Sequence, residues 1–339
     1  MLKSETVREL AREAGFDAVG FTRARRAPHA DGFLDWLAEG LHAGMAWLAR
    51  DPHTRCDPRV TLPGAATVIA LAMNYFCDDP PDPPDSAARG VIARYACGRD
   101  YHNLIRKRLR VLDRALAGMG GTQRCFVDSG PLLERDFAVA AGIAWHGKST
   151  LALHPRLGTW FFLAAVTTTL EFEPDPPMPD RCGSCVRCID ACPTRAITAP
   201  RKVDSGLCLS YWTIEHRGPF PEWVREKLGP RIFGCDDCLD ACPWNRFARE
   251  SREAGFRARA ASRLPIRDYL MLDEAEFRAL FEGSPIRRAG HEGFLRNCCT
   301  ALAHCGDTGD LPALDRVASG GLPMPAQHAA WAAAKIRAR

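Results

Sequence analysis

The chain is organised around residues 182–193, which read Cys182-Gly-Ser-Cys185-Val-Arg-Cys188-Ile-Asp-Ala-Cys192-Pro193. Three cysteines spaced by two residues can hold one iron–sulfur cubane in a tight turn. A fourth, three residues further on and followed by proline, ligates the other cluster of a pair. Zinc would need closed sets of four ligands, with two Cys-x-x-Cys pairs for each ion. That interpretation leaves Cys188 and the Cys-Pro ending unexplained, so the pattern predicts two [4Fe–4S] clusters.

A second, incomplete run covers residues 235–243 and reads Cys235-Asp-Asp-Cys238-Leu-Asp-Ala-Cys242-Pro243. Aligned on the first run, it has Ile232 where its first cysteine would stand. Cys208 lies between the runs and is the natural replacement, although a lone cysteine is often only a small buried residue. We therefore predict one cluster on Cys182, Cys185, Cys188 and Cys242, and the other on Cys192, Cys208, Cys235 and Cys238.

Length and composition indicate a soluble protein of two or three domains. The 339 residues are 46% hydrophobic and 25% charged, with a net charge of +4, which is ordinary for globular chains. There is no run of about 18 or more apolar residues of the kind that spans a membrane. The N-terminal twenty residues are amphipathic, carry acids and lack an apolar signal core. The cysteines show no disulfide-like framework, which is typical of a reducing compartment. Together these features predict a cytoplasmic protein that contacts no membrane.

Residues 1–170 are expected to form a layered α/β domain. Apolar stretches typical of strands alternate with amphipathic stretches typical of helices, and the sheet need not be all parallel. We expect strands over 18–21, 66–75, 124–127 and 159–170, and helices over 5–14, 32–50, 101–117 and 132–141.

Two further domains are expected beyond a proline-rich acidic linker, EFEPDPPMPD, at residues 171–180. Residues 171–250 contain the cysteine runs and form a ferredoxin-like module. Residues 251–339 turn helical and alanine-rich. Within them, 296–302 and 327–335 have the pattern of inner helices of two stacked hairpins, as in HEAT repeats.

Outside the cysteines, residue patterns do not identify where electrons meet a substrate. A Gly-x-Gly-x-x-Gly loop after a strand is absent, so a nicotinamide or flavin site is not predicted. Asp100-Tyr-His102 matches the start of the corrinoid motif Asp-x-His-x-x-Gly, but Ile105 replaces its glycine, so His102 is not expected to ligate cobalt. Asp128 ends a strand before a helix, where α/β active sites gather, although a turn or N-cap role is the commoner one. These features indicate an iron–sulfur oxidoreductase, with a ferredoxin-type electron carrier or an RNA-binding protein with redox-sensing clusters as alternatives.

Taken together, these segments resemble the epoxyqueuosine reductase family over nearly the whole chain. The resemblance rests on RYACGRDYH at 94–102, VDSGPLLER at 127–135, AGIAW at 141–145, CLSYWTIE at 208–215 and GSPIRR at 283–288, besides the cysteine frame. Ala144 and Ser149 depart from the family pattern, but neither is a cluster or acid position.

The resemblance implies a base-off cobalamin held between the α/β domain and the ferredoxin-like module, with no protein histidine on cobalt. It implies that the clusters reduce the cobalamin, that the Cys208-containing cluster is the nearer one, and that Asp128 donates a proton to the epoxide oxygen. The same resemblance places Arg55, Cys97, Asp128, Arg135, Lys148 and Ser210 around the corrin or the substrate.

The implied activity is reduction of epoxyqueuosine to queuosine at the wobble position of a tRNA anticodon. The implied partners are the modified anticodon stem-loop and an unidentified reductant, and the chain is expected to act as a monomer. The helical region and the arginines after residue 245, among them Arg287 and Arg288, would contact phosphates. A corrinoid reductive dehalogenase has a similar cofactor set and is the remaining alternative, although such enzymes typically carry an export signal.

Overall fold

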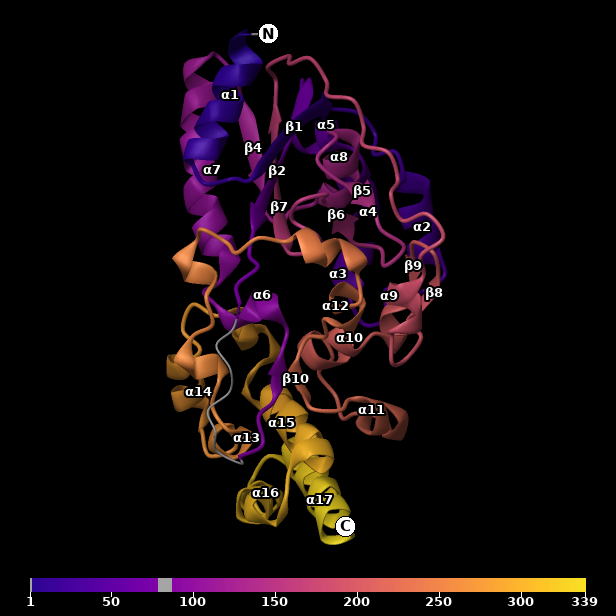
Figure 1. Cartoon of the computed structure of the whole chain (residues 1–339), viewed down its shortest axis with the longest axis vertical. Helices are drawn as coiled ribbons and strands as arrows, with labels where there is room; N and C mark the ends of the chain where they lie inside the picture. Colours follow the sequence, from indigo (N-terminus) through magenta and orange to yellow (C-terminus); the bar gives the residue numbers. More distant parts are fainter. Residues whose placement is uncertain (1, 79–86) are drawn as a thin grey trace.

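The computed structural model describes residues 2–78 and 87–339 (Figure 1). The N-terminal part is built on a four-stranded sheet in the order β1-β2-β7-β4, and every neighbouring pair is antiparallel. This is the mixed α/β architecture that the alternating pattern predicts. Its strands are β1 (Ala18–Arg23), β2 (Thr67–Asn74), β4 (Gln123–Phe126) and β7 (Phe161–Thr168).

Helices cover both faces of the sheet because β2 is apolar on both sides. Ile69 and Leu71 lie in one core with α1 (Leu2–Glu13) and α7 (Tyr101–Gly118). Ala70 and Ala72 lie in another core with α8 (Glu134–Ala140). Successive strand residues point to opposite faces, so two-sided burial explains why β2 reads as an unbroken apolar run.

The single helix expected over residues 32–50 is wrong. The structure has α2 (Ala30–Ala38) and α3 (Ala46–Ala49) with a turn between them. Gly40 and Ala43 have φ angles of 71° and 51°, which a continuous right-handed helix cannot accommodate. The remaining short elements of this part are α4 (Pro52–Cys56), α5 (Pro58–Thr61), β5 (Trp145–His146) and β6 (Ala152–Leu153).

The cysteine-rich segment consists of short helices and loops packed against the sheet domain. Asn245 fixes one contact, because its Oδ1 accepts hydrogen bonds from Thr159 N at 2.8 Å and Thr159 Oγ1 at 3.0 Å. Gly158 has a φ of 61°, and a Cβ there would lie 2.2 Å from that oxygen, so glycine is required. The elements are α9 (Arg187–Asp190), β8 (Ile197–Ala199), β9 (Lys202–Val203), α10 (Leu209–Ile214), α11 (Glu222–Lys227), β10 (Arg231–Phe233) and α12 (Asp237–Asp240).

Residues 91–97 connect the three parts. They form β3 (Val91–Ile92) and α6 (Arg94–Cys97), and β3 pairs in parallel with β10. Ile92 and Ala96 lie in the core of the C-terminal helices rather than in a core of the sheet domain. The arrangement places α6 beneath the sheet domain and above the C-terminal helices (Figure 1).

The C-terminal part is helical, as expected. Its central helix α15 is buried along residues 293–303 and packs against α17 and β10. Arg296 is fully buried on α15 and donates hydrogen bonds to the carbonyls of Trp212, His216 and Gly218, which joins this part to the cysteine-rich segment. A HEAT-like repeat stays a prediction. The helices are α13 (Ile266–Tyr269), α14 (Glu274–Leu280), α15 (His291–Cys305), α16 (Leu311–Ala318) and α17 (Pro323–Arg337).

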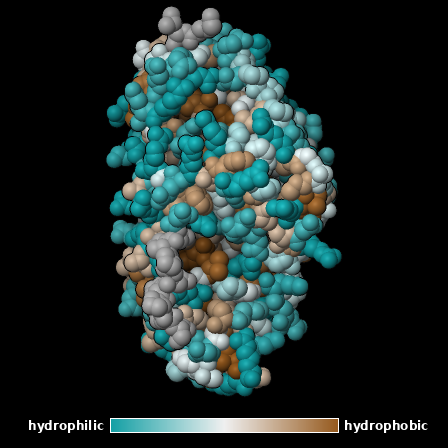
Figure 2. Space-filling view, viewed as in Figure 1, coloured by the Kyte–Doolittle hydropathy of each residue, from teal (hydrophilic) through white to brown (hydrophobic). Residues whose placement is uncertain are grey.

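Hydrophilic residues predominate on the face of the molecule in Figure 2, and hydrophobic residues form small separate patches there. In the part of the chain that the structure describes, helices with the length and apolar character needed to cross a bilayer are absent.

Candidate active site and cluster-binding region

Asp128 lies in a tight turn that follows β4. Its φ of 53° is in the left-handed region, which a non-glycine residue adopts only when its surroundings hold it. Glu134, at the start of α8, accepts a hydrogen bond from Asp128 N through Oε1 at 2.7 Å. This contact closes the turn and turns the carboxylate outward, with 64% of the side chain exposed.

Two side chains at the start of α7 meet the Asp128 carboxylate. Tyr101 Oη donates a hydrogen bond to Asp128 Oδ2 at 2.5 Å, and His102 Nε2 lies 3.4 Å from the same oxygen. The other ring nitrogen, His102 Nδ1, is 2.8 Å from Asp100 Oδ1. Asp100, His102 and Asp128 therefore form a continuous carboxylate–imidazole–carboxylate chain, with Tyr101 stacked on the His102 ring at 4.1 Å.

The contacts decide the charge of each group. Burial alone would lower the pKa of His102, but hydrogen bonds to Asp100 and Asp128 outweigh it and raise the pKa to about 9. Burial alone would raise the pKa of Asp128, but the hydrogen bonds from His102 and Tyr101 outweigh it and lower the pKa. At neutral pH the pair is thus an imidazolium beside a carboxylate, and the proton that Asp128 lacks is stored on His102.

Glu134 is the neutral acid of the site. Burial, followed by the nearby charge of Asp128, raises the pKa of Glu134 to about 8. A protonated Glu134 leaves Asp128 as the anionic member of the two carboxyl groups, because like charges this close disfavour joint ionisation.

Two of the predicted arginines flank this turn. Arg55 donates to Gly130 O at 3.1 Å and lies over the Trp47 ring at 5.3 Å. Its Nε is buried and finds no acceptor among the described residues. Arg135 is exposed, lies within electrostatic range of Asp128 and donates to Thr150 O at 2.6 Å.

The other predicted cofactor residues lie elsewhere around the region. Lys148 Nζ donates to Gly183 O at 2.7 Å, beside the first cysteine of the first run. Ser210 Oγ lies 3.5 Å from Cys235 O, within the cysteine-rich segment. Cys97 turns back on its own segment, with Sγ 3.6 Å from Ile92 O, and is half-buried against the C-terminal core. The structure therefore brings Arg55 and Arg135 to Asp128, but not these three residues.

The seven cysteines of the two runs and Cys208 between them fall into two groups in space. The thiol of Cys242 lies within electrostatic range of Cys182, Cys185 and Cys188. The thiol of Cys238 lies within range of Cys192, Cys208 and Cys235. These are the two sets of four that the sequence assigns to two clusters.

The spacing of the thiols argues against a single ion in either group. Within residues 2–78 and 87–339, one group of three His, Cys, Asp or Glu ligand atoms lies within 4.8 Å of one another, and it contains no cysteine. The thiols are thus too far apart to share one zinc ion. Backbone N–H groups point at the sulfurs, those of Ser210 and Tyr211 at Cys208 and that of Trp244 at Cys242, as hydrogen bonds to cluster sulfurs require.

Ile232 explains the displaced ligand. It lies in β10, is fully buried in the C-terminal core, and its carbonyl accepts a hydrogen bond from Asn297 Nδ2 at 2.9 Å. Residue 232 therefore packs in the core and cannot ligate a cluster. Cys208, at the start of α10, lies beside the group of Cys192, Cys235 and Cys238 instead.

Tyr101, His102 and Glu134 are the site residues that sequence reasoning missed. Tyr101 and His102 stand in the segment Asp100-Tyr-His102, whose only chemical signal in the sequence is a partial cobalt-ligation motif. Glu134 follows Asp128 by six residues, but its neutral state depends on burial, which residue patterns do not show.

Comparison with known proteins gives consistent matches over the whole chain. Residues 181–245 match the 4Fe-4S double cluster binding domain, and residues 55–129 match a family described as epoxyqueuosine reductase QueG, DUF1730. An epoxyqueuosine reductase of Xanthomonas campestris pv. campestris is 43% identical over 97% of this chain and 95% of that protein. The Pseudomonas aeruginosa epoxyqueuosine reductase is 38% identical over 97% of this chain and 93% of that protein.

Solved structures give the same match. A crystal structure of epoxyqueuosine reductase with an epoxyqueuosine-modified tRNA-Tyr stem loop has a TM-score of 0.93 at 31% identity, covering 99% of this chain and 90% of that chain. A Bacillus subtilis epoxyqueuosine reductase, whose catalytic aspartate loop is swung out of the active site, has a TM-score of 0.93 at 30% identity, with the same coverage.

Proposed function

Because this chain belongs to the epoxyqueuosine reductase family, we propose that it reduces epoxyqueuosine to queuosine at the wobble position of a tRNA anticodon. The family resemblance of the sequence is thereby confirmed. The reaction removes the epoxide oxygen as water and leaves a carbon–carbon double bond, so it consumes two electrons and two protons. The protein has to supply an electron route and a proton route that meet at one place.

The electron route runs through the 4Fe-4S double cluster domain at residues 181–245. In the proposal, Cys182, Cys185, Cys188 and Cys242 hold one cluster, and Cys192, Cys208, Cys235 and Cys238 hold the other. The spatial grouping of the thiols supports this assignment. Burial raises the pKa of Cys242 to about 11 and that of Cys235 to about 12, so bound iron would be needed to hold them as thiolates.

Cobalamin is proposed to lie between the Asp128 turn and the cysteine-rich segment, in the base-off form. Both ring nitrogens of His102 are engaged by Asp100 and Asp128, which supports a corrin without a histidine on cobalt. The free buried Nε of Arg55 and the exposed Arg135 are available to polar groups of the corrin. When bound, the corrin would supply low-potential electrons to the epoxide.

The cluster nearer this site is proposed to be the one that contains Cys208. Tyr95 lies within electrostatic range of Asp128 and packs on Phe233, with ring centroids 6.2 Å apart. Phe233 precedes Cys235 by two residues, so this contact connects the acid site with the second group of cysteines.

The proton route is proposed to end at Asp128. An epoxide oxygen that develops negative charge needs an acid close by, and Asp128 is the exposed carboxyl group in the turn. His102 holds the proton that passes through Asp128 to that oxygen, the second proton comes from solvent, and Tyr101 and Glu134 hold the carboxylate in position. The family precedent is the Bacillus subtilis enzyme, for which a catalytic aspartate loop is named.

Residues 1–170 would then hold cobalamin and the modified base, residues 171–250 the clusters, and residues 251–339 the tRNA. Arg287 and Arg288 line an open groove of about 890 Å³ on the C-terminal part, together with Arg217 and Arg316. Four guanidinium groups on one groove suit a phosphate backbone, and three acids, Asp273, Glu274 and Glu292, line the same groove and reduce its net positive charge. The proposed enzyme works as a monomer and takes its electrons from an external reductant.

The position of Asp128 carries this proposal, and Asp128→Asn tests it. The substitution keeps the size of the side chain but removes its acid function. Stem-loop binding should stay at the wild-type level, while single-turnover conversion of epoxyqueuosine should fall by about 10²-fold or more. Wild-type turnover in Asp128→Asn would overturn the proton-donor role. Loss of binding alone would instead indicate a recognition role. A ferredoxin-type carrier or an RNA-binding redox sensor would show no conversion in the wild-type protein.

A further inference from the structure

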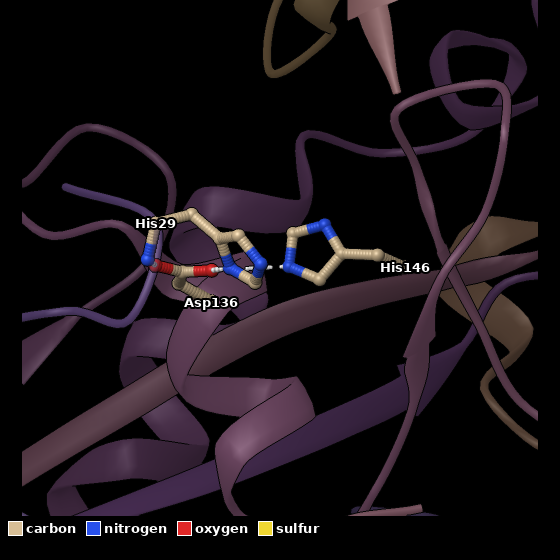
Figure 3. Close-up of side chains that lie close together, drawn as sticks. All are labelled: His29, Asp136 and His146. Atoms are coloured by element: carbon tan, nitrogen blue, oxygen red, sulfur yellow. Dashed lines mark hydrogen bonds and ion pairs between the residues drawn. The ribbon is translucent and has the colours of Figure 1, made fainter. Parts of the chain in front are cut away.

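Two histidines and a buried aspartate converge at α8, outside the Asp128 network. His29 precedes α2, Asp136 lies in α8 and His146 ends β5. Asp136 follows His29 by 107 residues and precedes His146 by 10 residues. Figure 3 shows both imidazole rings directed at the same carboxylate oxygen of Asp136. This is the one group of three or more His, Cys, Asp or Glu residues within residues 2–78 and 87–339 whose ligand atoms all lie within 4.8 Å of one another.

The carboxylate is fixed and the rings are close. Asp136 is buried, with a side chain only 5% exposed, and its Oδ2 accepts a hydrogen bond from the backbone N of His29 at 2.8 Å. Its Oδ1 lies 2.6 Å from His29 Nδ1 and 3.1 Å from His146 Nε2. Burial alone would raise the pKa of Asp136, but the hydrogen bonds from His146 and His29 outweigh it and lower the pKa.

The distances fit the first shell of a transition-metal ion. Zinc bonds to imidazole nitrogen and carboxylate oxygen are about 2.0–2.2 Å long, so ligand atoms around one tetrahedral ion lie roughly 3.2–3.5 Å apart. The separation of 3.1 Å at His146 is already close to this range. The 2.6 Å separation at His29 has to widen, which a side chain that is 64% exposed can allow by rotation.

We propose that His29, Asp136 and His146 form a binding site for a zinc-like divalent ion, separate from Asp128 and from the cluster cysteines. Two imidazoles and one carboxylate are ligands for borderline ions such as Zn²⁺ and not for Mg²⁺ or Ca²⁺. The exposed side of His29 provides the entry path and leaves the fourth position to water.

The site would join three separate segments. The ion would connect the loop before α2, helix α8 and strand β5 through one carboxylate. The first turn of α8 carries Glu134, which closes the Asp128 turn, and Arg135, which flanks it. An ion at Asp136 would therefore stabilise the support of the Asp128 turn without contacting the substrate. This role does not depend on the identity of the reaction.

Zinc binding to the cluster-loaded protein tests the site. The protein with eight irons per chain is stripped of loosely held metal, dialysed against Zn²⁺ and examined by metal analysis and zinc-edge X-ray absorption. The expected result is one zinc per chain with nitrogen and oxygen neighbours at about 2.0–2.1 Å and no sulfur at about 2.3 Å. Sulfur neighbours would show that zinc sits on cysteines and would overturn the proposal.

The variants His29→Ala and His146→Gln each remove one ligand. Each should weaken zinc binding by more than the roughly 10- to 100-fold that follows loss of an outer-shell partner. His29 is largely exposed, so His29→Ala keeps the test valid if His146→Gln does not fold. The control is His53→Ala, an exposed histidine outside the group, which should bind zinc like the wild type. Equal affinity in all four proteins would refute the site, and this result is independent of turnover.

Discussion

Replacing His102 with glutamine tests whether His102 supplies the proton that Asp128 delivers to the epoxide oxygen. The His102→Gln side chain keeps a polar group near Asp128 but cannot carry a transferable proton. In the wild-type protein, His102 has a pKa of about 9 and is almost fully protonated at pH 7.5. In the variant, Asp128 has to take its proton from solvent.

The magnitude follows from the carboxyl group alone. With an ordinary aspartate pKa of about 3.9, roughly one Asp128 in 4,000 is protonated at pH 7.5. Water and Tyr101 can donate a proton in some turnovers, which compensates part of the loss. We therefore expect the rate of single-turnover conversion to fall by about 10³-fold, within the range of roughly 10² to 10⁴ for general acids. The wild-type rate should stay level up to about pH 8 and fall as the pH rises through 9, because the required form is protonated. The variant should lose rate across the whole range from pH 6 upward, because the protonated fraction of a carboxyl group with that pKa falls throughout it.

The assay is single-turnover reduction of an epoxyqueuosine stem loop by pre-reduced enzyme, followed by mass spectrometry of the nucleosides across pH 6 to 10. His53→Gln is the matched control, because it changes an exposed histidine outside this network. A His102→Gln variant with the wild-type rate and an unchanged decline near pH 9 would refute the relay. Restoration of its rate by added imidazole would support it.

Four further predictions address the clusters, the tRNA surface and the fold. Cys242→Ser should halve the iron content of the reconstituted protein, whereas Cys305→Ser, an exposed thiol outside both groups, should leave iron analysis unchanged; equal iron in both would refute the ligand assignment. Arg287→Glu should weaken stem-loop binding and reduce the salt slope of log K by about 0.7–0.9 for each lost phosphate contact, and an unchanged slope in a salt titration would contradict the groove. Arg288 ion-pairs with Glu215, so Arg288→Glu should weaken binding and also lower the melting temperature in a thermal scan. Arg296→Ala should lower the free energy of unfolding by about 3 kcal/mol or more in urea titrations, because three half-buried carbonyls lose the donor that a fully buried side chain supplies; a loss below about 1 kcal/mol would show that these bonds contribute little.

The cysteine frame was predictable because its chemistry is local. Spacing of two and three residues fixes which thiols can reach one cubane, and the vacancy at Ile232 pointed to Cys208. The structure adds the reason, since Ile232 is a core residue of β10. Alternating apolar stretches likewise predicted the layered α/β domain, since burial patterns follow the periods of strand and helix, but they left the strand directions open, and the sheet is antiparallel throughout.

Other features could not be predicted, because they depend on tertiary contacts. The break in the helix expected over 32–50 depends on the left-handed backbone of Gly40 and Ala43. The family resemblance places Cys97 near the corrin or the substrate, and the contact of its sulfur with Ile92 O at 3.6 Å is one that spacing does not show. His29, Asp136 and His146 are separated by 107 and 10 residues, and no sequence spacing indicates that they meet. The charges of His102 and Glu134 likewise follow from burial and partners rather than from residue type.

The most direct test of the central claim is conversion of the modified nucleoside itself. The purified chain, reconstituted with iron, sulfide and cobalamin and supplied with a strong reductant under anaerobic conditions, is incubated with an epoxyqueuosine-containing anticodon stem-loop. Mass spectrometry of the digested nucleosides should show loss of one oxygen atom and appearance of queuosine, with no conversion when cobalamin is omitted. Unchanged epoxyqueuosine in the presence of fully loaded clusters and cobalamin would contradict the account.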